Sequence, residues 1–286
     1  MYIVDFFQRA FRKENIGIII YLILNTLFVI VLFGHPLIGI VIYGLSLVIA
    51  LSPIGEFILR IQQGCRRIKR QDHLERLMPL FNEVYARAKQ RDPSLPNNIR
   101  LFISREQSAN AFATGRKTIC LTSGLLLLSD EEIKATLAHE FGHLSNRDTD
   151  LILFIAVGNL VVTIAFVFWR TLFWTIGTAV SVANRSFAGI IVTFLIDLFL
   201  VFCIWIWTKI GTLLVMHSSR KNEFEADRFA YDLGYGRELI SLLNRFESME
   251  LPDSKGLWAN LVSSHPETSV RIEHVEQLLE QHKVIS

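Results

Sequence analysis

Two histidines four positions apart are the feature of this chain with the clearest chemical meaning. His139 and His143 enclose Glu140 and two further residues. Residues four apart share one face of an α-helix, so both imidazoles would point at one site. Such a pair suits Zn²⁺, which takes imidazole nitrogens at about 2.0–2.1 Å. Glu140 would then reach a water molecule beside the metal without binding the metal, which is the position of a general base in hydrolysis.

A catalytic zinc site needs a third protein ligand, and Glu223 is the best candidate. Asp227 follows it four positions later, so the two carboxylates would share one helical face. Asp227 is expected to accept the free ring N–H of a ligand histidine and so fix its tautomer. Glu225 is rotated by about 200° from Glu223 and should point elsewhere. An acidic surface helix is the alternative interpretation of this segment.

The histidine pair falls on a helix that is predicted independently of it. Ser129 and Glu132 have the spacing of a capping box, so a helix is expected to begin there and to continue into the motif. This context disfavours the alternative, two ordinary surface histidines. Periodicity and turn residues predict the other elements of the soluble part: helices over 66–91, 221–233, 237–249 and 267–282, and strands over 99–103, 110–114 and 117–122.

The composition indicates a membrane protein. The chain is 51% hydrophobic and only 20% charged, whereas soluble domains carry about 25% charged residues. Between Asn15 and Gly55 there is no Asp, Glu, Lys or Arg, and that length is enough for two helices across a bilayer. The net charge of +2 is too small to indicate a nucleic-acid partner. Four spans are predicted, over 16–34, 36–57, 151–169 and 187–208.

The distribution of basic residues predicts the orientation of the spans. Lysines and arginines precede the first span and follow the second, while the turn at Gly34-His35-Pro36 has none. The positive-inside rule therefore places the N-terminus and the chain after residue 60 in the cytoplasm. Residues 2–13 are expected to lie on the membrane surface as an interfacial helix instead of forming a cleavable signal peptide. Two spans between His139 and Glu223 leave both residues on the same side of the membrane.

Asp197 and the three cysteines give weaker indications of function. Asp197 in the fourth span should avoid lipid, either by contacting polar groups such as Asn159 or by lining an ion pathway. The three cysteines, Cys65, Cys120 and Cys203, show no ligand-like spacing and fit a reducing compartment. We interpret them as inert thiols, although acylation of Cys65 beside a membrane exit is conceivable.

Several motifs in one order resemble the HtpX-type membrane zinc metalloproteases, which are related to the CAAX prenyl endoproteases. The resemblance covers nearly the whole chain. It implies a cytoplasm-facing, gluzincin-like peptidase domain and a role in membrane-protein quality control under stress. The motifs are Asn110-Ala111-Phe112-Ala113-Thr114-Gly115, Ala138-His139-Glu140-Phe141-Gly142-His143, Asn146-Arg147-Asp148, Glu223-Phe224-Glu225-Ala226-Asp227, His265-Pro266 and Arg271-Ile272.

The resemblance also implies roles for individual residues. It places Asn110, Ala111 and Phe112 on an edge strand that binds substrate, with a plain buried strand as the alternative. His265 is implied to stabilise the oxyanion, whereas a structural histidine before a helix is the alternative. Two further polar residues are expected to surround the metal ligands together with Asp227. These are Asp148 and Arg220.

The predicted fold is a mainly α membrane protein of about four transmembrane helices with an α+β gluzincin-like zinc peptidase domain carrying a small β-sheet. The predicted segments are 1–59 with the first hairpin, 60–150 with the zinc-binding helix, 151–208 with the second hairpin, and 209–286 with the third ligand.

The predicted function is zinc-dependent cleavage of membrane or misfolded polypeptides on the cytoplasmic side of the inner membrane. The expected partners are polypeptide substrates and the lipid bilayer. One alternative is a processing peptidase with a narrow substrate range. Another is a zinc-dependent scaffold or chaperone that does not cleave, which the intact Glu140 argues against. A transporter is disfavoured because the ligands flank the spans instead of lying within them.

Overall fold

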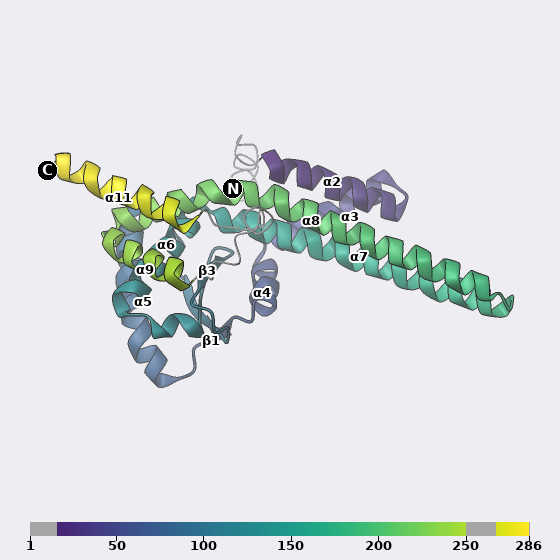
Figure 1. The fold of residues 1–286 in the computed structure, drawn as a ribbon, viewed down its shortest axis with the longest axis horizontal. Helices are drawn as coiled ribbons and strands as arrows, with labels where there is room; N and C mark the ends of the chain where they lie inside the picture. Colours follow the sequence, from purple (N-terminus) through teal and green to yellow (C-terminus); the bar gives the residue numbers. More distant parts are fainter. Residues whose placement is uncertain (1–15, 250–266, 286) are drawn as a thin grey trace.

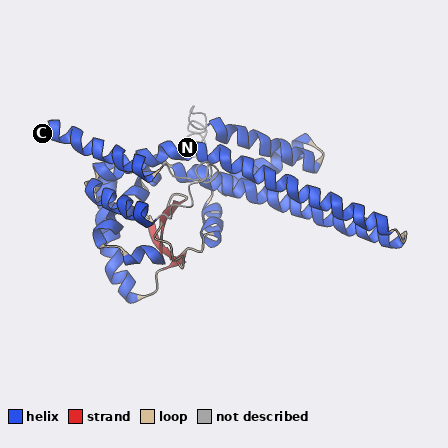
Figure 2. Ribbon diagram, viewed as in Figure 1, coloured by secondary structure: helices blue, strands red, loops and turns tan. Residues whose placement is uncertain are grey.

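A computed structural model describes residues 16–249 and 267–285 of the chain. The predicted interfacial segment at residues 2–13 and His265 lie outside the described residues. The chain forms a helical lobe with a small sheet and, beside it, a bundle of helices dominated by one long hairpin (Figures 1 and 2). The segments that form the lobe precede and follow that hairpin in the sequence. In space they pack together as one lobe.

The first predicted hairpin is present, but its second helix is broken. α2 (Ile16–Phe33) and α3 (Pro36–Ala50) meet at Gly34, which takes a φ of +66°. The predicted span 36–57 was wrong in its last third, because the chain bends by 78° between α3 and α4 (Pro53–Gln62). Ser52 and Pro53 explain the break, since the Ser52 hydroxyl accepts from the Ile54 N–H and proline occupies the first helical position.

The second hairpin is longer than predicted at both ends. α7 (Asp148–Ala183) continues beyond the predicted end at residue 169, and α8 (Phe187–Asp232) is one continuous helix. The prediction of a separate helix over 221–233 was therefore wrong, and the reason is that no proline interrupts the chain between the fourth span and that segment. Among the described residues, Val162–Ala183 and Phe187–Ile210 are each long and apolar enough to cross a bilayer. α3 and α4 would form a third span only if the bent pair crossed the bilayer as one unit.

Arg170 explains why α7 extends beyond the uncharged run. Its guanidinium binds both carboxylate oxygens of Asp197 on α8, at 2.6 and 2.8 Å. Asp197 thus forms an ion pair across the hairpin. The side chain of Asn159, the other contact expected for Asp197, is not among those described. A paired charge is far less costly within a membrane span than an isolated one, so both helices tolerate it.

The sheet has four strands in the order β1-β2-β4-β3. β2 (Arg100–Ser104) runs parallel to β4 (Thr118–Thr122), and β3 (Ala111–Thr114) pairs antiparallel with β4 across a turn at Gly115. The predicted hairpin is confirmed, and it leaves β3 at one edge. The helix predicted from residue 66 begins later, as α5 (Gln71–Arg91), because Arg66–Arg67 pair with β2 as the short strand β1.

Three helices and the sheet enclose the core of the lobe around α6 (Asp130–Asn146). α5 and α9 (Gly236–Met249) pack against α6, and α11 (Thr268–Ile285) packs against α9. Leu137 and Phe141 of α6 are fully buried, and the Phe141 ring stacks on Tyr85 of α5 at 5.4 Å. A 3₁₀ turn, η2 (Ser123–Leu127), leads from β4 towards α6. α6 is therefore held on several sides, which fixes the direction of its side chains.

The sheet also brings two cysteines together. Cys65, just before β1, and Cys120, in β4, lie close enough for their thiols to affect each other's pKa. The two residues are 55 positions apart in sequence, and the pairing of β1 with β2 and of β2 with β4 brings them to the same part of the sheet. Interaction with the Cys120 thiol, together with the nearby charge of Arg60, lowers the pKa of the Cys65 thiol. Both thiols are free in this structure.

Candidate metal centre

The capping box sets the register of the helix that carries the histidines. The Ser129 hydroxyl accepts from the Glu132 N–H at 3.3 Å, and the Ser129 N–H donates to the Glu132 carboxylate at 2.9 Å. From this start α6 runs unbroken to Asn146, and both His139 and Glu140 are buried. The two histidines share one face, as their spacing predicts, with Nε2 atoms 3.1 Å apart.

α8 crosses α6 closely enough to bring Glu223 to the same point. Gly142 makes the crossing possible, because a Cβ at that position would lie only 2.8 Å from the Cα of Ala226. One Glu223 oxygen lies 3.4 Å from His139 Nε2, and the other lies 3.4 Å from His143 Nε2. Residues from two helices, 80 positions apart in sequence, thus converge.

The three side chains fit a tetrahedral zinc ion. Bonds of about 2.0–2.1 Å in tetrahedral geometry separate neighbouring donor atoms by about 3.3 Å. The measured separations of 3.1, 3.4 and 3.4 Å match that edge length. His139, His143 and Glu223 together offer two imidazoles and one carboxylate, and their ligand atoms all lie within 4.8 Å of one another. Two nitrogens and one carboxylate also form a donor set found in catalytic zinc sites.

Asp227 and Arg271 hold the first histidine from behind. The Asp227 carboxylate lies 2.8 Å from His139 Nδ1, which leaves Nε2 to face the ligand cluster. Arg271 of α11 binds both oxygens of the same carboxylate, at 2.6 and 2.8 Å, and its Nη1 lies 3.3 Å from Glu223. The predicted contact of Asp227 with a ligand histidine is therefore present in the geometry.

These charges favour a cation at the cluster. Burial alone would raise the pKa of Asp227, but hydrogen bonds from Arg271 and His139 hold it at about 2. Burial opposes charge on His139, yet the carboxylates of Asp227 and Glu223 raise its pKa above the ordinary value. Burial likewise opposes the charge of Arg271, whose pKa the same carboxylates raise. A field that stabilises a positive charge on a buried imidazole also attracts a divalent ion.

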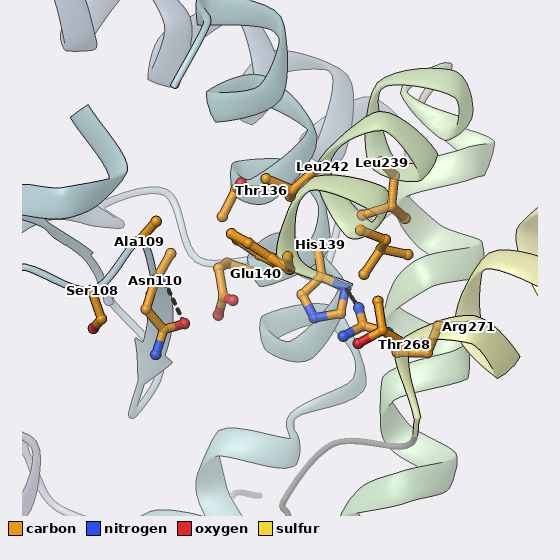
Figure 3. A pocket seen from close by; sticks show the side chains of 13 residues that line it. Ser108, Ala109, Asn110, Thr136, His139, Glu140, Leu239, Leu242, Thr268 and Arg271 are labelled. Carbon is orange, nitrogen blue, oxygen red and sulfur yellow. Dashed lines mark hydrogen bonds between the residues drawn. The ribbon is translucent and has the colours of Figure 1, made fainter. Parts of the chain in front are cut away.

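Glu140 lies between the cluster and the sheet edge. The backbone N–H of Ala113 in β3 donates to Glu140 Oε2 at 2.6 Å. A cavity of about 490 Å³ opens at this point. Figure 3 shows Ser108, Ala109 and Asn110 on one wall of it, Leu239, Leu242 and Arg271 on the other, and Glu140 with His139 between them.

The structure brings together most, but not all, of the residues predicted for the site. Asn110 and Ala111 line the cavity with Glu140, whereas Phe112 does not. Asn110 precedes β3, and within the strand Phe112 points to the opposite face from Ala111. The side chains of Asp148 and Arg220 are not among those described, although their backbones lie in α7 and α8.

Arg271 is a site residue to which the sequence analysis assigned no role, although Arg271-Ile272 is one of the motifs that carry the resemblance. A signal for it exists in the sequence, because Arg271 lies four positions before Val275 on the inward face of the predicted helix 267–282. Val275 is fully buried. An arginine on such a face requires a buried acidic partner, and Asp227 is that partner.

Comparison with known proteins places this geometry among metallopeptidases. Residues 71–279 match peptidase family M48. The chain is 30% identical over 201 residues to a protease HtpX homologue of Caldanaerobacter subterraneus subsp. tengcongensis, covering 63% of this chain and 66% of that protein. It is 27% identical over 264 residues to protease HtpX of Shewanella pealeana, covering 84% of this chain and 87% of that protein.

A solved structure shows the same fold. The crystal structure of S. mikatae Ste24p matches with a TM-score of 0.50 and 20% identity, covering 96% of this chain and 65% of that one. The chain spans about two thirds of the length of several relatives, with 66% and 65% for two of the curated ones.

Proposed function

Because the chain belongs to peptidase family M48, we propose that it is a membrane-anchored, zinc-dependent endopeptidase. The convergence of His139, His143 and Glu223 at tetrahedral separations is the observation that carries this proposal. A bound zinc ion would supply Lewis-acid chemistry, which activates water and polarises a carbonyl group.

The side chain of Glu140 performs the proton transfers. It takes a proton from the attacking water, whose oxygen forms the new bond to the carbonyl carbon. It then delivers that proton to the amine nitrogen as the C–N bond breaks. Ala113 N–H holds Glu140 Oε2 at 2.6 Å and so orients the carboxylate towards the cavity. Asp227 keeps His139 in the tautomer that presents Nε2 to the metal.

The edge of β3 is the proposed platform for substrate. Ala113 directs its N–H away from β4, towards Glu140, and by alternation Ala111 presents its backbone to the same side. An extended peptide can pair with such an edge through main-chain hydrogen bonds, which tolerate many side chains. Besides Arg271, the facing wall carries an apolar group of side chains: Leu239, Leu242, Leu243 and Phe246.

The apolar wall supports a role on membrane or misfolded polypeptides. Such chains expose apolar side chains that a folded soluble protein buries, and the cavity offers them a matching surface. Membrane-protein quality control on the cytoplasmic side of the inner membrane is therefore the role we propose. The same proposal divides the chain into four segments, with boundaries at residues 59, 150 and 208. Segments 60–150 and 209–286 together form one peptidase domain.

Replacing Glu140 tests the mechanism. Glu140→Gln should lower casein cleavage by detergent-purified protein by about 10²–10⁴-fold, the usual contribution of a general acid–base group. Zinc content, measured by mass spectrometry, should stay at the wild-type stoichiometry. Glu131→Gln, on the exposed start of the same helix, is the matched control and should retain full activity. Wild-type cleavage by the Glu140 variant would disprove this mechanism.

Two further outcomes separate the alternatives. A chelator should abolish cleavage by the wild type, and binding of casein without any cleavage would favour a zinc-dependent scaffold. Profiling with a peptide library distinguishes broad quality control from a narrow processing peptidase, because only the former should cleave at many unrelated sequences.

A further inference from the structure

The short helix α4 has an outward face that is unusual for a helix at the surface of a soluble lobe. Ile54, Phe57 and Ile61 follow one another at helical spacing and are 60%, 54% and 62% exposed. The opposite face is the one that packs on the protein, through buried Gly55 and Leu59. A water-exposed helix normally turns polar residues outward, so an apolar outer face indicates a partner that covers it.

The direction of α4 indicates which partner this is. α3 is one of the apolar helices of the first hairpin, and α4 follows it after a bend of 78°. A helix nearly perpendicular to a membrane-crossing helix runs close to the plane of the bilayer. Figure 1 shows α4 running across the direction of the α7–α8 hairpin, on the side where the lobe begins. The outer face of α4 therefore lies at the end of an apolar helix of the bundle, next to the lobe.

The charged residue of the helix fits the same environment. Arg60 places its guanidinium over the ring of Phe57 at 5.9 Å and over Phe102 of β2 at 5.1 Å. Arginine commonly covers apolar surface with its stem while its charged end stays at headgroup level. The next basic residues along the chain, Arg66 and Arg67, are exposed in β1. This order, apolar face and then basic residues, is typical of helices that lie in the interface.

We propose that α4 is an in-plane membrane helix, with Ile54, Phe57 and Ile61 embedded in the interfacial layer of the lipid bilayer on the side of the lobe. Its inner face contacts the hairpin that forms the active-site edge. Glu56 accepts from Thr118 at 2.5 Å, and Gln63 accepts from Thr114 at 2.6 Å, on either side of the β3–β4 turn. The bilayer surface thereby sets the position of β3 relative to incoming membrane segments.

The test measures the depth of α4 and does not depend on peptidase activity. The three native cysteines are replaced by alanine, and a single cysteine is introduced as Phe57→Cys or Ile61→Cys and labelled with an environment-sensitive fluorophore. The protein is reconstituted in phospholipid vesicles that contain nitroxide-labelled lipids. We expect quenching that is strongest with the nitroxide near the top of the acyl chain, at a depth of about 5–10 Å.

Glu75→Cys is the matched control, because it is an exposed helix position of the lobe. Its label should show no quenching by any of the lipids. A solvent-like, unquenched signal at position 57 would overturn the proposal. An apolar but unquenched signal would also overturn it, since that result would mean that protein, such as a second copy of this chain, covers the face.

A second measurement uses the unmodified chain. In nanodiscs that carry a photoactivatable phospholipid, illumination should attach lipid to residues 54–61 and leave α5 unmodified. Absence of adducts on α4, with adducts present on α7 and α8, would contradict the proposal even if the cysteine variants failed to fold. Because neither readout involves cleavage, a failure of this proposal is distinguishable from a failure of the proposed peptidase function.

Discussion

Glu223 is the residue that converts a pair of histidines into a three-ligand site. It is almost completely buried, 3% exposed, and touches both imidazoles. Glu223→Ala should reduce bound zinc from stoichiometric to trace amounts, measured by mass spectrometry after dialysis. Glu225→Ala is the control, because that glutamate is exposed and two positions away. Stoichiometric zinc in the Glu223 variant would mean that another residue is the third ligand.

Asp227 is expected to act on the metal through His139. Its carboxylate fixes the Nδ1 side of the ring at 2.8 Å. Asp227→Asn should weaken zinc binding by about 10–100-fold, the usual effect of removing a group that orients a histidine ligand. A competition titration with a zinc-sensitive dye measures this loss. An affinity equal to that of the wild type would mean that packing around the ring is sufficient to orient it.

The sequence predicts some residues of the site better than others, for a physical reason. His139 and His143 are four apart on one helix, so local geometry alone places them together. Glu223 is predicted because it and Asp227 are also four positions apart on one helix. Helix periodicity places Arg271 on an inward face but does not identify Asp227 and Glu223 as its partners. Those contacts and the proximity of Cys65 to Cys120 arise from packing between elements that are distant in sequence.

At the scale of elements, the start of α6 predicts a dependence on pH. Burial would raise the pKa of Glu132, but hydrogen bonds from Ser129 and the charge of Arg245 hold it below the ordinary value. A lowered pKa in the folded state gives stability that is present above the unfolded value of about 4.3 and is lost as the pH falls through the folded value.

The wild type should therefore lose thermal stability more steeply below about pH 4.3 than Glu132→Gln does. Glutamine retains a hydrogen-bonding group at this position but cannot titrate. Thermal unfolding of the metal-free proteins in detergent, followed by circular dichroism, measures the difference. If thermal stability fell equally steeply with decreasing pH in both proteins, Glu132 would contribute nothing to the pH dependence.

Element boundaries were predicted well where turn chemistry is local and poorly where it is not. Gly34, Gly115 and the capping box mark their turns and helix start directly. Ser52 and Pro53 cause the bend before α4. Hydropathy alone does not reveal this bend, because the apolar residues continue on both sides of it. Conversely, the change from apolar to polar composition along α8 suggested two helices, although the backbone is continuous.

At the scale of the whole molecule, the α7–α8 hairpin extends well past the α2–α3 hairpin (Figure 1). The Arg170–Asp197 pair joins its two helices. Because one hairpin leaves the lobe and returns to it, we expect the proposed metal ligands on α6 and α8 to lie on one side of the membrane. We predict which side this is from the basic residues around the first hairpin, because the fold itself does not determine it.

Labelling from outside the cell can test that orientation. In spheroplasts, a membrane-impermeant maleimide should modify a cysteine introduced by Asn184→Cys, at the exposed tip of the hairpin. The same reagent should modify Glu75→Cys in the lobe only after the membrane is permeabilised. We expect this pattern because lysine and arginine cluster on both sides of the first hairpin but not at its turn. The opposite pattern would place the metal centre outside the cytoplasm, where the proposed quality-control role on the cytoplasmic side would be impossible.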